Sequence, residues 1–195
     1  MKRYFKADRK VDDPDEKLVY RIGNGDSEAA ALLIDKHLAA ITGLARNILG
    51  DESEAEDIAQ EVFLRVWTNA GKWKPGKAKF STWMHRVAIN LCYDQLRKKR
   101  EVYMDVLPEH IDDIAPNAQE SVENSHQQRQ IQAALATLAP RQRVAIVLCH
   151  LNELGNIEAA QSMRISVEAL ESLLARGRRV LRIRLAGQIE ELLGE

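Results

Sequence analysis

The 195-residue sequence has no apolar run close to the roughly 20 residues that span a bilayer, and its first residues, MKRYFKADRK, lack the apolar stretch of a secretory signal. It contains only two cysteines, Cys92 and Cys149, which lie far apart in the chain. Because a structural disulfide is unusual in a chain without an export signal, both thiols are expected to be reduced. These features predict a cytoplasmic protein that is not inserted in a membrane.

The sequence also lacks the motifs by which many enzymes are recognised. It shows no glycine-rich phosphate loop, no nucleophile elbow and no paired catalytic carboxylates. The nearest approach to a metal site is two pairs of side chains, His85 with Cys92 and Cys149 with His150. Neither pair reaches the four-ligand pattern of a zinc site. We therefore predict a protein that is not an enzyme and that needs no cofactor or metal.

The formal net charge is only -1, but the charges are segregated along the chain. Residues 51–61 and 105–123 carry several acids and no Lys or Arg, whereas basic residues gather at 97–100 and 176–184. This pattern suggests a basic protein surface as partner for the acidic segments and nucleic-acid phosphates as partner for the basic ones. Each run could equally be an ordinary solvated helix face, whose ion pairs contribute little.

Apolar residues recur at spacings of three and four rather than two, so the sequence predicts an all-α protein. We expect two small helical domains, at residues 1–103 and 126–195. Residues 104–125 hold two prolines and several acids without a sustained apolar stripe, and they are predicted to form a flexible acidic linker.

In the first block, serines are predicted to cap three helices: Ser27, Ser53 as part of a capping box with Glu56, and Ser81. The helix after Ser27 should end near Gly50. Its apolar stripe is Ala30, Leu33, Ile34, Leu38, Ile41, Ala45 and Ile48. The helix after Ser53 should have a buried face and a second, acidic face.

In the second block, Pro140 suits the first turn of a helix, and residues 156–163 read as a short helix followed by a turn at Arg164-Ile165. Ser166 should then cap a last helix that runs to about Leu193. This is the pattern of a helix-turn-helix, whose second helix can enter the major groove of DNA. Any amphipathic helix pair produces a similar pattern, so this motif alone leaves a purely structural role open.

The segments DIAQEVFLRVW and FSTWMHRVAINLCYDQLRKKR, followed by LAPRQRVAIVL and ISVEALESLLARGRRVLR, together resemble extracytoplasmic function (ECF) sigma factors. The first two are similar to sigma regions 2.1 to 2.4, and the last two to regions 4.1 and 4.2. The resemblance implies a sigma-2 domain that opens the minus-10 element of promoter DNA and a sigma-4 domain that reads the minus-35 element. It also implies binding to core RNA polymerase, at the beta-prime clamp coiled coil and the beta flap, and control by an anti-sigma factor.

The resemblance assigns three sets of site residues. The set that docks on core polymerase is Asp57, Gln60, Glu61, Phe63 and Leu64, with Phe63 and Leu64 as the expected apolar anchor. The minus-10 set is Lys79, Ser81, Thr82, Trp83, Arg86, Asn90, Arg97, Lys98, Lys99 and Arg100. The minus-35 set is Ser166, Glu168, Glu171, Ser172, Ala175, Arg176, Arg178 and Arg179, in which Arg176 is the expected guanine reader. Within the minus-10 segment, Trp83, together with the nearby Trp73 and Phe80, could instead belong to the core.

Two positions depart from the family's pattern. Arg164 stands in the turn where Gly is frequent, and a residue other than Gly in a left-handed conformation costs about 1 kcal/mol. Gly177 stands in a helix where Ala is usual, which costs another ~1 kcal/mol unless a close contact offsets it.

Two other functions remain as alternatives. A stand-alone helix-turn-helix regulator would use only the second block and would bind specific duplex DNA without polymerase. A helical enzyme that processes RNA or uses nucleotides would show turnover that depends on particular acids.

Overall fold

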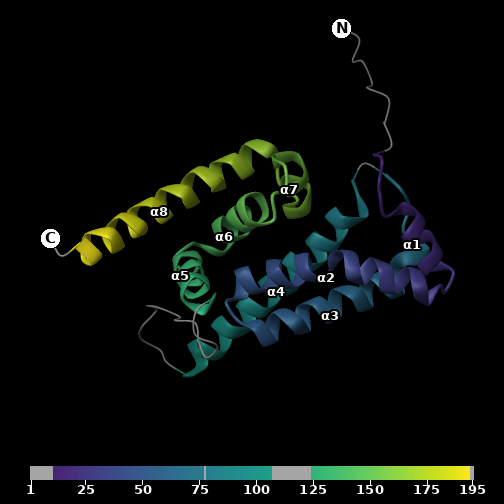
Figure 1. Cartoon of the computed structure of the whole chain (residues 1–195), viewed down its shortest axis with the longest axis horizontal. Coiled ribbons are helices and arrows are strands. Elements are labelled where there is room, and N and C mark those ends of the chain that lie inside the picture. The colour runs from purple at the N-terminus through teal and green to yellow at the C-terminus, as the bar shows by residue number, and fades with distance from the viewer. Residues whose placement is uncertain (1–10, 77, 107–123, 194–195) are drawn as a thin grey trace, which may run out of the picture.

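The computed structural model describes residues 11–76, 78–106 and 124–193, and all regular secondary structure within them is helical (Figure 1). The elements are α1 (Glu16–Gly23), α2 (Ser27–Leu49), α3 (Glu52–Asn69), the 3-10 turn η1 (Ala70–Lys72), α4 (Phe80–Val106), α5 (Asn124–Ala136), α6 (Pro140–Ile146), the π-helical turn η2 (Val147–Leu151), α7 (Asn156–Met163) and α8 (Val167–Leu193). The predicted all-α fold is confirmed.

The predicted linker at 104–125 lies mainly outside the described residues, so the domain boundaries stay a prediction. Helices α1 to α4 are called the N-terminal bundle below, and α5 to α8 the C-terminal bundle.

Two of the predicted serine caps are replaced by the aspartates before them. The Asp26 side chain accepts a hydrogen bond from Ala29 N at 3.1 Å, and that of Asp51 accepts one from Glu54 N at 2.9 Å. Ser27 lies in the first turn of α2 and Ser53 in that of α3. Aspartate caps as well as serine does, and its charge adds a favourable interaction with the helix dipole.

The start of α4 is bound by a residue from far away in the chain, so the prediction that Ser81 caps this helix is wrong. The Asp13 carboxylate accepts a hydrogen bond from Phe80 N at 2.6 Å and one from Asp15 N at 2.9 Å. Val11 N also donates to Gly76 O at 3.2 Å. The segment before α1 is thereby fastened to the loop and helix start that follow η1.

The core of the N-terminal bundle lies between α2, α3 and α4. Its largest fully buried side chains include Phe80, Leu33, Ile41, Leu44, Ile48, Met84 and Ile89. The predicted stripe of α2 is confirmed at most positions, but Leu38 is 43% exposed. The neighbouring His37 turns inward in its place, with Nε2 2.9 Å from Oδ2 of the buried Asp15. A polar pair thus interrupts the apolar face of α2.

In the C-terminal bundle, α6, α7 and α8 pack around Val144, Leu148, Ala159 and Leu170, all of which are fully buried. A Cβ atom on Gly177 would lie 3.0 Å from Ile146 Cγ1, which is closer than nearly all Cβ contacts. The close approach of α8 to α6 therefore explains why Gly stands at this helix position.

Arg164 ends α7 in the left-handed region, with φ 54° and ψ 45°, as the turn of a helix-turn-helix requires. We expect Arg164→Gly to raise the free energy of unfolding by about 1 kcal/mol, because glycine adopts this conformation without strain. Urea titration of the full chain measures the change. Arg164→Ala, which keeps the strain and removes the side chain, is the control and should bring no gain.

No helix among the described residues is both long and apolar enough to cross a membrane. The two bundles contact each other, with α7 beside the first turns of α4 and with α5, α6 and η2 against α2 (Figure 1).

Candidate functional surfaces

The outer face of α3 combines acidic, polar and apolar side chains. Asp57, Gln60 and Leu64 are exposed, and Glu61 forms an ion pair with Arg65 at 2.8 Å. Leu64 is 62% exposed. Phe63, by contrast, is only 8% exposed, because it follows the core stripe of Ala55, Ala59 and Val66. Phe63 therefore lies mainly in the core, and Leu64 is the exposed member of the predicted apolar anchor.

A second exposed apolar side chain, Trp67, lies one turn after Leu64 and is 51% exposed. Trp67 was not among the residues predicted from the sequence for this surface. Its spacing of three from Leu64 was the available signal, since residues three apart lie on one helix face. We call Asp57, Gln60, Leu64 and Trp67 the α3 face below.

The start of α4 brings together four residues of the predicted minus-10 set, and each polar group meets a residue of α7. Glu158 lies 3.3 Å from Lys79 Nζ, 3.5 Å from Ser81 Oγ and 3.4 Å from Thr82 Oγ1. The Arg86 guanidinium donates to the backbone carbonyl of Gln161 at 3.0 Å. Asn90, one turn further, is exposed.

Three aromatic rings form a cluster beside these polar groups. The Phe80 ring is fully buried, lies at 85° to the Trp73 ring with centroids 5.3 Å apart, and stacks on the Trp83 ring at 5.2 Å. Trp73 and Trp83 are half-buried against the core. This packing favours the core interpretation for Phe80 and leaves part of each tryptophan ring at the surface.

Two buried ionisable groups lie in this part of the N-terminal bundle. His85, 7% exposed, has its pKa lowered to about 4, chiefly by burial. Glu158 acts against this shift and His37 adds to it. Burial alone would raise the pKa of Asp15, but hydrogen bonds from His37 and Lys36 outweigh it and hold that pKa below its usual value.

The basic run near the end of α4 is only partly directed to solvent. Lys98 and Arg97 are exposed, the latter while it pairs with Asp94 at 3.0 Å, whereas Lys99 Nζ lies 2.7 Å from Glu54 Oε2. The side chain of Arg100 lies outside the described residues. Lys99 therefore ties α4 to α3, which the sequence did not reveal.

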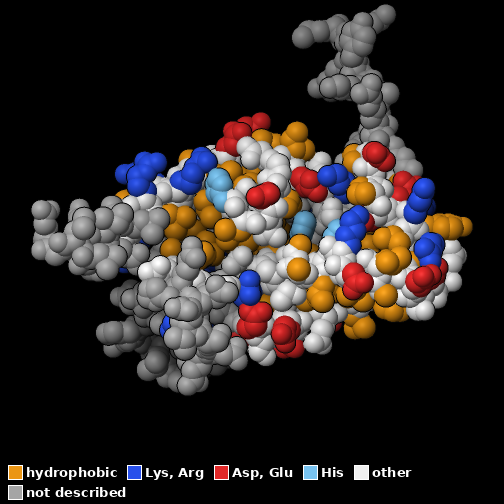
Figure 2. All heavy atoms as spheres, in the orientation of Figure 1, with side chains coloured by type: hydrophobic (Ala, Val, Ile, Leu, Met, Phe, Trp, Pro, Cys, Tyr) orange, Lys and Arg blue, Asp and Glu red, His pale blue; other side chains and the backbone are white. Residues whose placement is uncertain are grey.

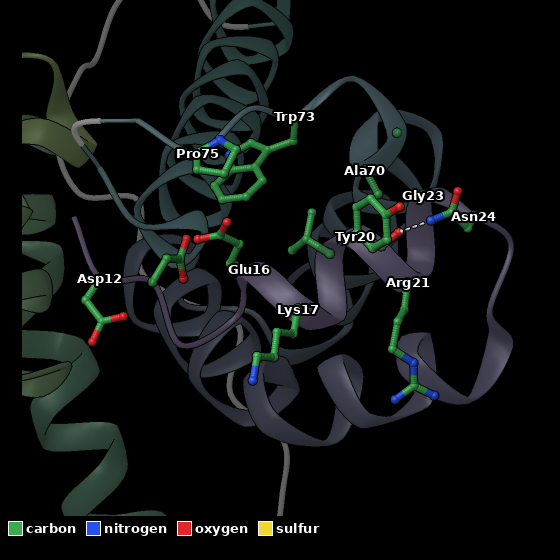
Figure 3. A pocket seen from close by; sticks show the side chains of 13 residues that line it. Asp12, Glu16, Lys17, Tyr20, Arg21, Gly23, Asn24, Ala70, Trp73 and Pro75 are labelled. Carbon is green, nitrogen blue, oxygen red and sulfur yellow. Dashed lines mark hydrogen bonds between the residues drawn. The ribbon is translucent and has the colours of Figure 1, made fainter. Parts of the chain in front are cut away.

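A pocket of about 810 Å³ lies between α1 and residues 70–75 (Figure 3). Its lining includes Tyr20 and Trp73, acidic and basic side chains of residues 12–21, and the small residues Gly23 and Gly71. A Cβ atom on Gly23 would lie 2.9 Å from Gly71 Cα, so α1 reaches η1 this closely only because residue 23 is glycine. The pocket could not be predicted from the sequence, because it forms between segments that are distant in the chain.

The outer face of α8 is open to solvent. All residues of the predicted minus-35 set are exposed, while Leu170 and Leu174 bury the opposite side. Ser166 caps α8 as predicted, since its Oγ accepts from Ala169 N at 3.2 Å. Basic side chains lie over α8 in Figure 2. Arg176 Nε donates to Ser172 O at 3.2 Å, which leaves the guanidinium on the exposed side of the helix.

The remaining candidate ligands form no metal site in the described part of the chain, where no group of three or more His, Cys, Asp or Glu side chains converges. Both cysteines are free thiols. Cys92 is fully buried, and burial raises its pKa to about 12, whereas Cys149 is half-buried.

Comparison with known families matches residues 33–102 to Sigma-70 region 2 and residues 128–181 to Sigma-70 region 4. Over 180 residues the chain is 32% identical to the ECF RNA polymerase sigma factor SigW of Bacillus subtilis, with 87% of this chain and 96% of that protein covered. It is 33% identical over 162 residues to the ECF RNA polymerase sigma factor SigE of Mycolicibacterium smegmatis. That match covers 82% of this chain but only 62% of the relative.

Solved structures show the same fold at lower identity. CnrH, in complex with the cytosolic domain of CnrY, has a TM-score of 0.69 at 23% identity, with 90% of this chain and 99% of CnrH covered. RpoE of Bartonella quintana, in complex with the anti-sigma factor NepR, has a TM-score of 0.67 at 21% identity, with 80% and 96% covered. Sigma factors are not enzymes, which agrees with the missing catalytic motifs. The two matched regions and the identity to SigW show that the chain belongs to the ECF sigma factors of the sigma-70 family.

Proposed function

We propose that this chain directs core RNA polymerase to promoters by binding the enzyme through the α3 face and the minus-35 duplex through α8. The observation that carries the proposal is the face of α8, on which every residue of the minus-35 set is exposed while Leu170 and Leu174 anchor the helix in the core. An α-helix fits the major groove, where its exposed side chains can read base edges.

The α3 face suits a basic rod such as the clamp coiled coil of the beta-prime subunit. Asp57 supplies negative charge for orientation, but exposed ion pairs contribute little to affinity. Leu64 and Trp67 supply the apolar area that binding requires, since Trp is among the residues that most often dominate interfaces.

The start of α4 and the neighbouring pocket are the proposed site for the melted minus-10 strand. Lys79 and Arg86 offer positive charge, and Ser81 and Thr82 offer hydroxyl groups. An unstacked base needs a cavity with aromatic faces and hydrogen-bonding groups, which Tyr20, Trp73 and the carboxylates of the pocket in Figure 3 provide. Strand separation is then driven by binding energy within the holoenzyme and not by nucleotide hydrolysis.

Arg176→Ala and Arg178→Ala should have different effects, because base contacts carry sequence information and phosphate contacts do not. Loss of an Arg contact to guanine costs roughly 1–3 kcal/mol of discrimination. We expect Arg176→Ala to reduce the preference for the cognate minus-35 element about tenfold, and Arg178→Ala to weaken binding to all sequences alike. Transcription by reconstituted holoenzyme from wild-type and altered minus-35 templates measures both. Equal loss of discrimination in the two variants would contradict this assignment.

We also propose that an anti-sigma protein holds the chain inactive. CnrH and RpoE, which share its fold, were solved in complex with CnrY and with the anti-sigma factor NepR. The exposed α3 and α8 faces are surfaces that such a protein could cover. Pull-down of the chain from its native cells should recover a specific inhibitor, and repeated failure to recover one would count against this part of the proposal.

The decisive experiment for the proposed function is transcription in vitro with purified chain, core polymerase and a genomic template library. RNA should start from a defined set of promoters only when the chain is present. A stand-alone regulator would instead bind specific duplex DNA tightly without polymerase, and failure to start RNA from any template would refute the proposed function.

A further inference from the structure

The loop between η1 and α4 belongs to the proposed strand site, but its own sequence opposes a fixed conformation. Residues 71–79 include four lysines, and like charges close together in a chain repel one another and extend it. Lys74, Pro75 and Gly76 are exposed, while Trp73 and Pro75 line the pocket (Figure 3). Contacts from elsewhere in the chain are therefore needed to keep this loop and the start of α4 in one arrangement.

The segment before α1 supplies two such contacts. Val11 N donates to Gly76 O within the loop, at 3.2 Å. Oδ2 of Asp13 accepts from Phe80 N, at the first residue of α4, at 2.6 Å. Oδ1 of Asp13 accepts from Asp15 N at 2.9 Å, and the side chain is only 7% exposed. Because both oxygens are engaged and buried, Asp13 acts on the strand site through the position of α4 and not by touching DNA.

The other end of this segment is fixed to α2. The buried Asp15 carboxylate lies 2.9 Å from His37 Nε2 and 2.5 Å from Lys36 Nζ. Removal of a buried carboxylate from its partners is strongly unfavourable, so Asp15 stays on α2 while the bundle is folded. Pro14 stands between the two aspartates, and its ring holds φ at about −65°, which limits rotation between them. Hydrogen bonds thus connect α2 through residues 13–15 to the start of α4.

We propose that residues 11–15 are a brace for the minus-10 strand site, in which Asp13 and Asp15 are positioning residues that hold the loop and the start of α4 in the strand-binding arrangement before DNA arrives. This inference rests on the proposed function for the identity of the site, whereas the hydrogen bonds are independent of it. An arranged site binds more tightly, because apparent affinity falls with the fraction of molecules in the competent conformation.

The first measurement is amide hydrogen exchange of the full chain without polymerase or DNA, read by mass spectrometry. Asp13→Ala removes the acceptor of Phe80 N. We expect amides of the loop, and those of the first turn of α4 after Phe80, to exchange about tenfold faster than in the wild type, since a hydrogen bond to a charged group shifts an equilibrium by at least that factor. The matched control is Asp35→Ala, which removes the same charge from an exposed position on α2 and should leave this exchange unchanged.

The second measurement is binding of reconstituted holoenzyme to a promoter whose minus-10 region is already single-stranded, taken from those that the template library identifies. In Asp13→Ala the DNA concentration at half-saturation should rise about tenfold, because only a minority of molecules hold the loop in place. The plateau should stay at the wild-type level, since excess DNA draws the displaced loop back to the binding arrangement. Affinity for core polymerase should also be unchanged, because the α3 face lies on another helix.

Asp15→Ala distinguishes positioning from a direct contact with DNA. Asp15 is too deeply buried to meet a strand, yet its loss should raise the half-saturation concentration as Asp13→Ala does. The double variant should be no worse than the weaker binder of the two, because both changes break the same connection. Asp13→Asn keeps an oxygen that can accept from Phe80 N and should restore part of the affinity. Urea titration checks that each variant is folded, and Asp15→Asn, which keeps the shape of the side chain, replaces Asp15→Ala if that variant is not.

Three results would each overturn the proposal. Unchanged exchange in Asp13→Ala, or equal exchange in Asp13→Ala and Asp35→Ala, would show that residues 11–15 do not hold the loop. Faster exchange with wild-type half-saturation would show that strand binding does not need this arrangement. A binding defect in Asp13→Ala without one at Asp15 would assign Asp13 a direct contact instead. Failure of the proposed function would appear elsewhere, as the absence of any promoter in the template library, and would leave the exchange measurement valid.

Discussion

Replacing Leu64 and Trp67 together by alanine is expected to lower the affinity of the chain for core RNA polymerase by roughly 100-fold or more. Both side chains are more than half exposed, at 62% and 51%, so little of their area is buried within the chain itself. At an interface, truncation of a central Trp commonly costs 2 kcal/mol or more, and a neighbouring Leu adds to this. Titration of labelled chain with core polymerase measures the loss.

The folded state of this double variant should be almost unchanged, because α3 is held by Ile58, Val62 and Val66 on its other side. Ile183→Ala, at an equally exposed apolar residue of α8, is the control and should affect polymerase affinity much less. If the double variant unfolds at the same urea concentration as the wild type and also binds polymerase with wild-type affinity, the α3 face has no part in the proposed function.

Acidification from pH 6.5 to pH 5 should cost the chain about 2 kcal/mol of stability through His85 alone. Burial lowers the pKa of His85 from 6.5 to about 4 in the folded chain. The unfolded chain therefore takes up the proton first, and stability falls as the pH drops below 6.5. The loss continues at about 1.4 kcal/mol per pH unit until the folded pKa is reached, and above pH 6.5 this group has no effect.

His85→Gln separates this effect from all other titrations, since the variant cannot gain the proton. Urea titrations at pH 7 and pH 5 should show a smaller loss for the variant than for the wild type, with a difference of about 2 kcal/mol. The Asp15 carboxyl does not interfere, because its pKa is lowered and its contribution is lost only below the ordinary value of 3.8. Parallel pH profiles of the two proteins would contradict the assigned burial of His85.

Features that depend on neighbouring residues could be predicted from the sequence. Pro140 at the start of α6, Ser166 as the cap of α8 and the short helix at 156–163 all stand where the sequence places them. Each of these features depends on residues within a few positions in the chain, such as the fixed φ angle of Pro140 and the hydrogen bond from Ala169 N to Ser166 Oγ. The buried and exposed faces of α8 could also be predicted, because helical periodicity depends only on residues three or four positions apart.

Features that depend on distant residues could not be predicted. The cap of α4 comes from Asp13, which precedes Phe80 by 67 positions, and Ser81 was the better local candidate. Phe63 and Leu64 are adjacent and both apolar, so only the packing of α3 distinguishes the buried ring from the exposed one. His37 could be recognised as an inward-facing residue only with its partner Asp15 in view.

The bond between Asp13 and the start of α4 also concerns any exchange of promoter specificity between related sigma factors. The loop before α4 is held by residues 11–15 as well as by its own sequence, through Val11 with Gly76 and Asp13 with Phe80. A chimaera that transplants only residues 72–90 would lack these two anchors. The start of its α4 would then be positioned by the residues of the recipient protein, and the grafted side chains would be displaced with it. An exchange of this part of the protein would therefore have to transfer residues 11–15 together with residues 72–90.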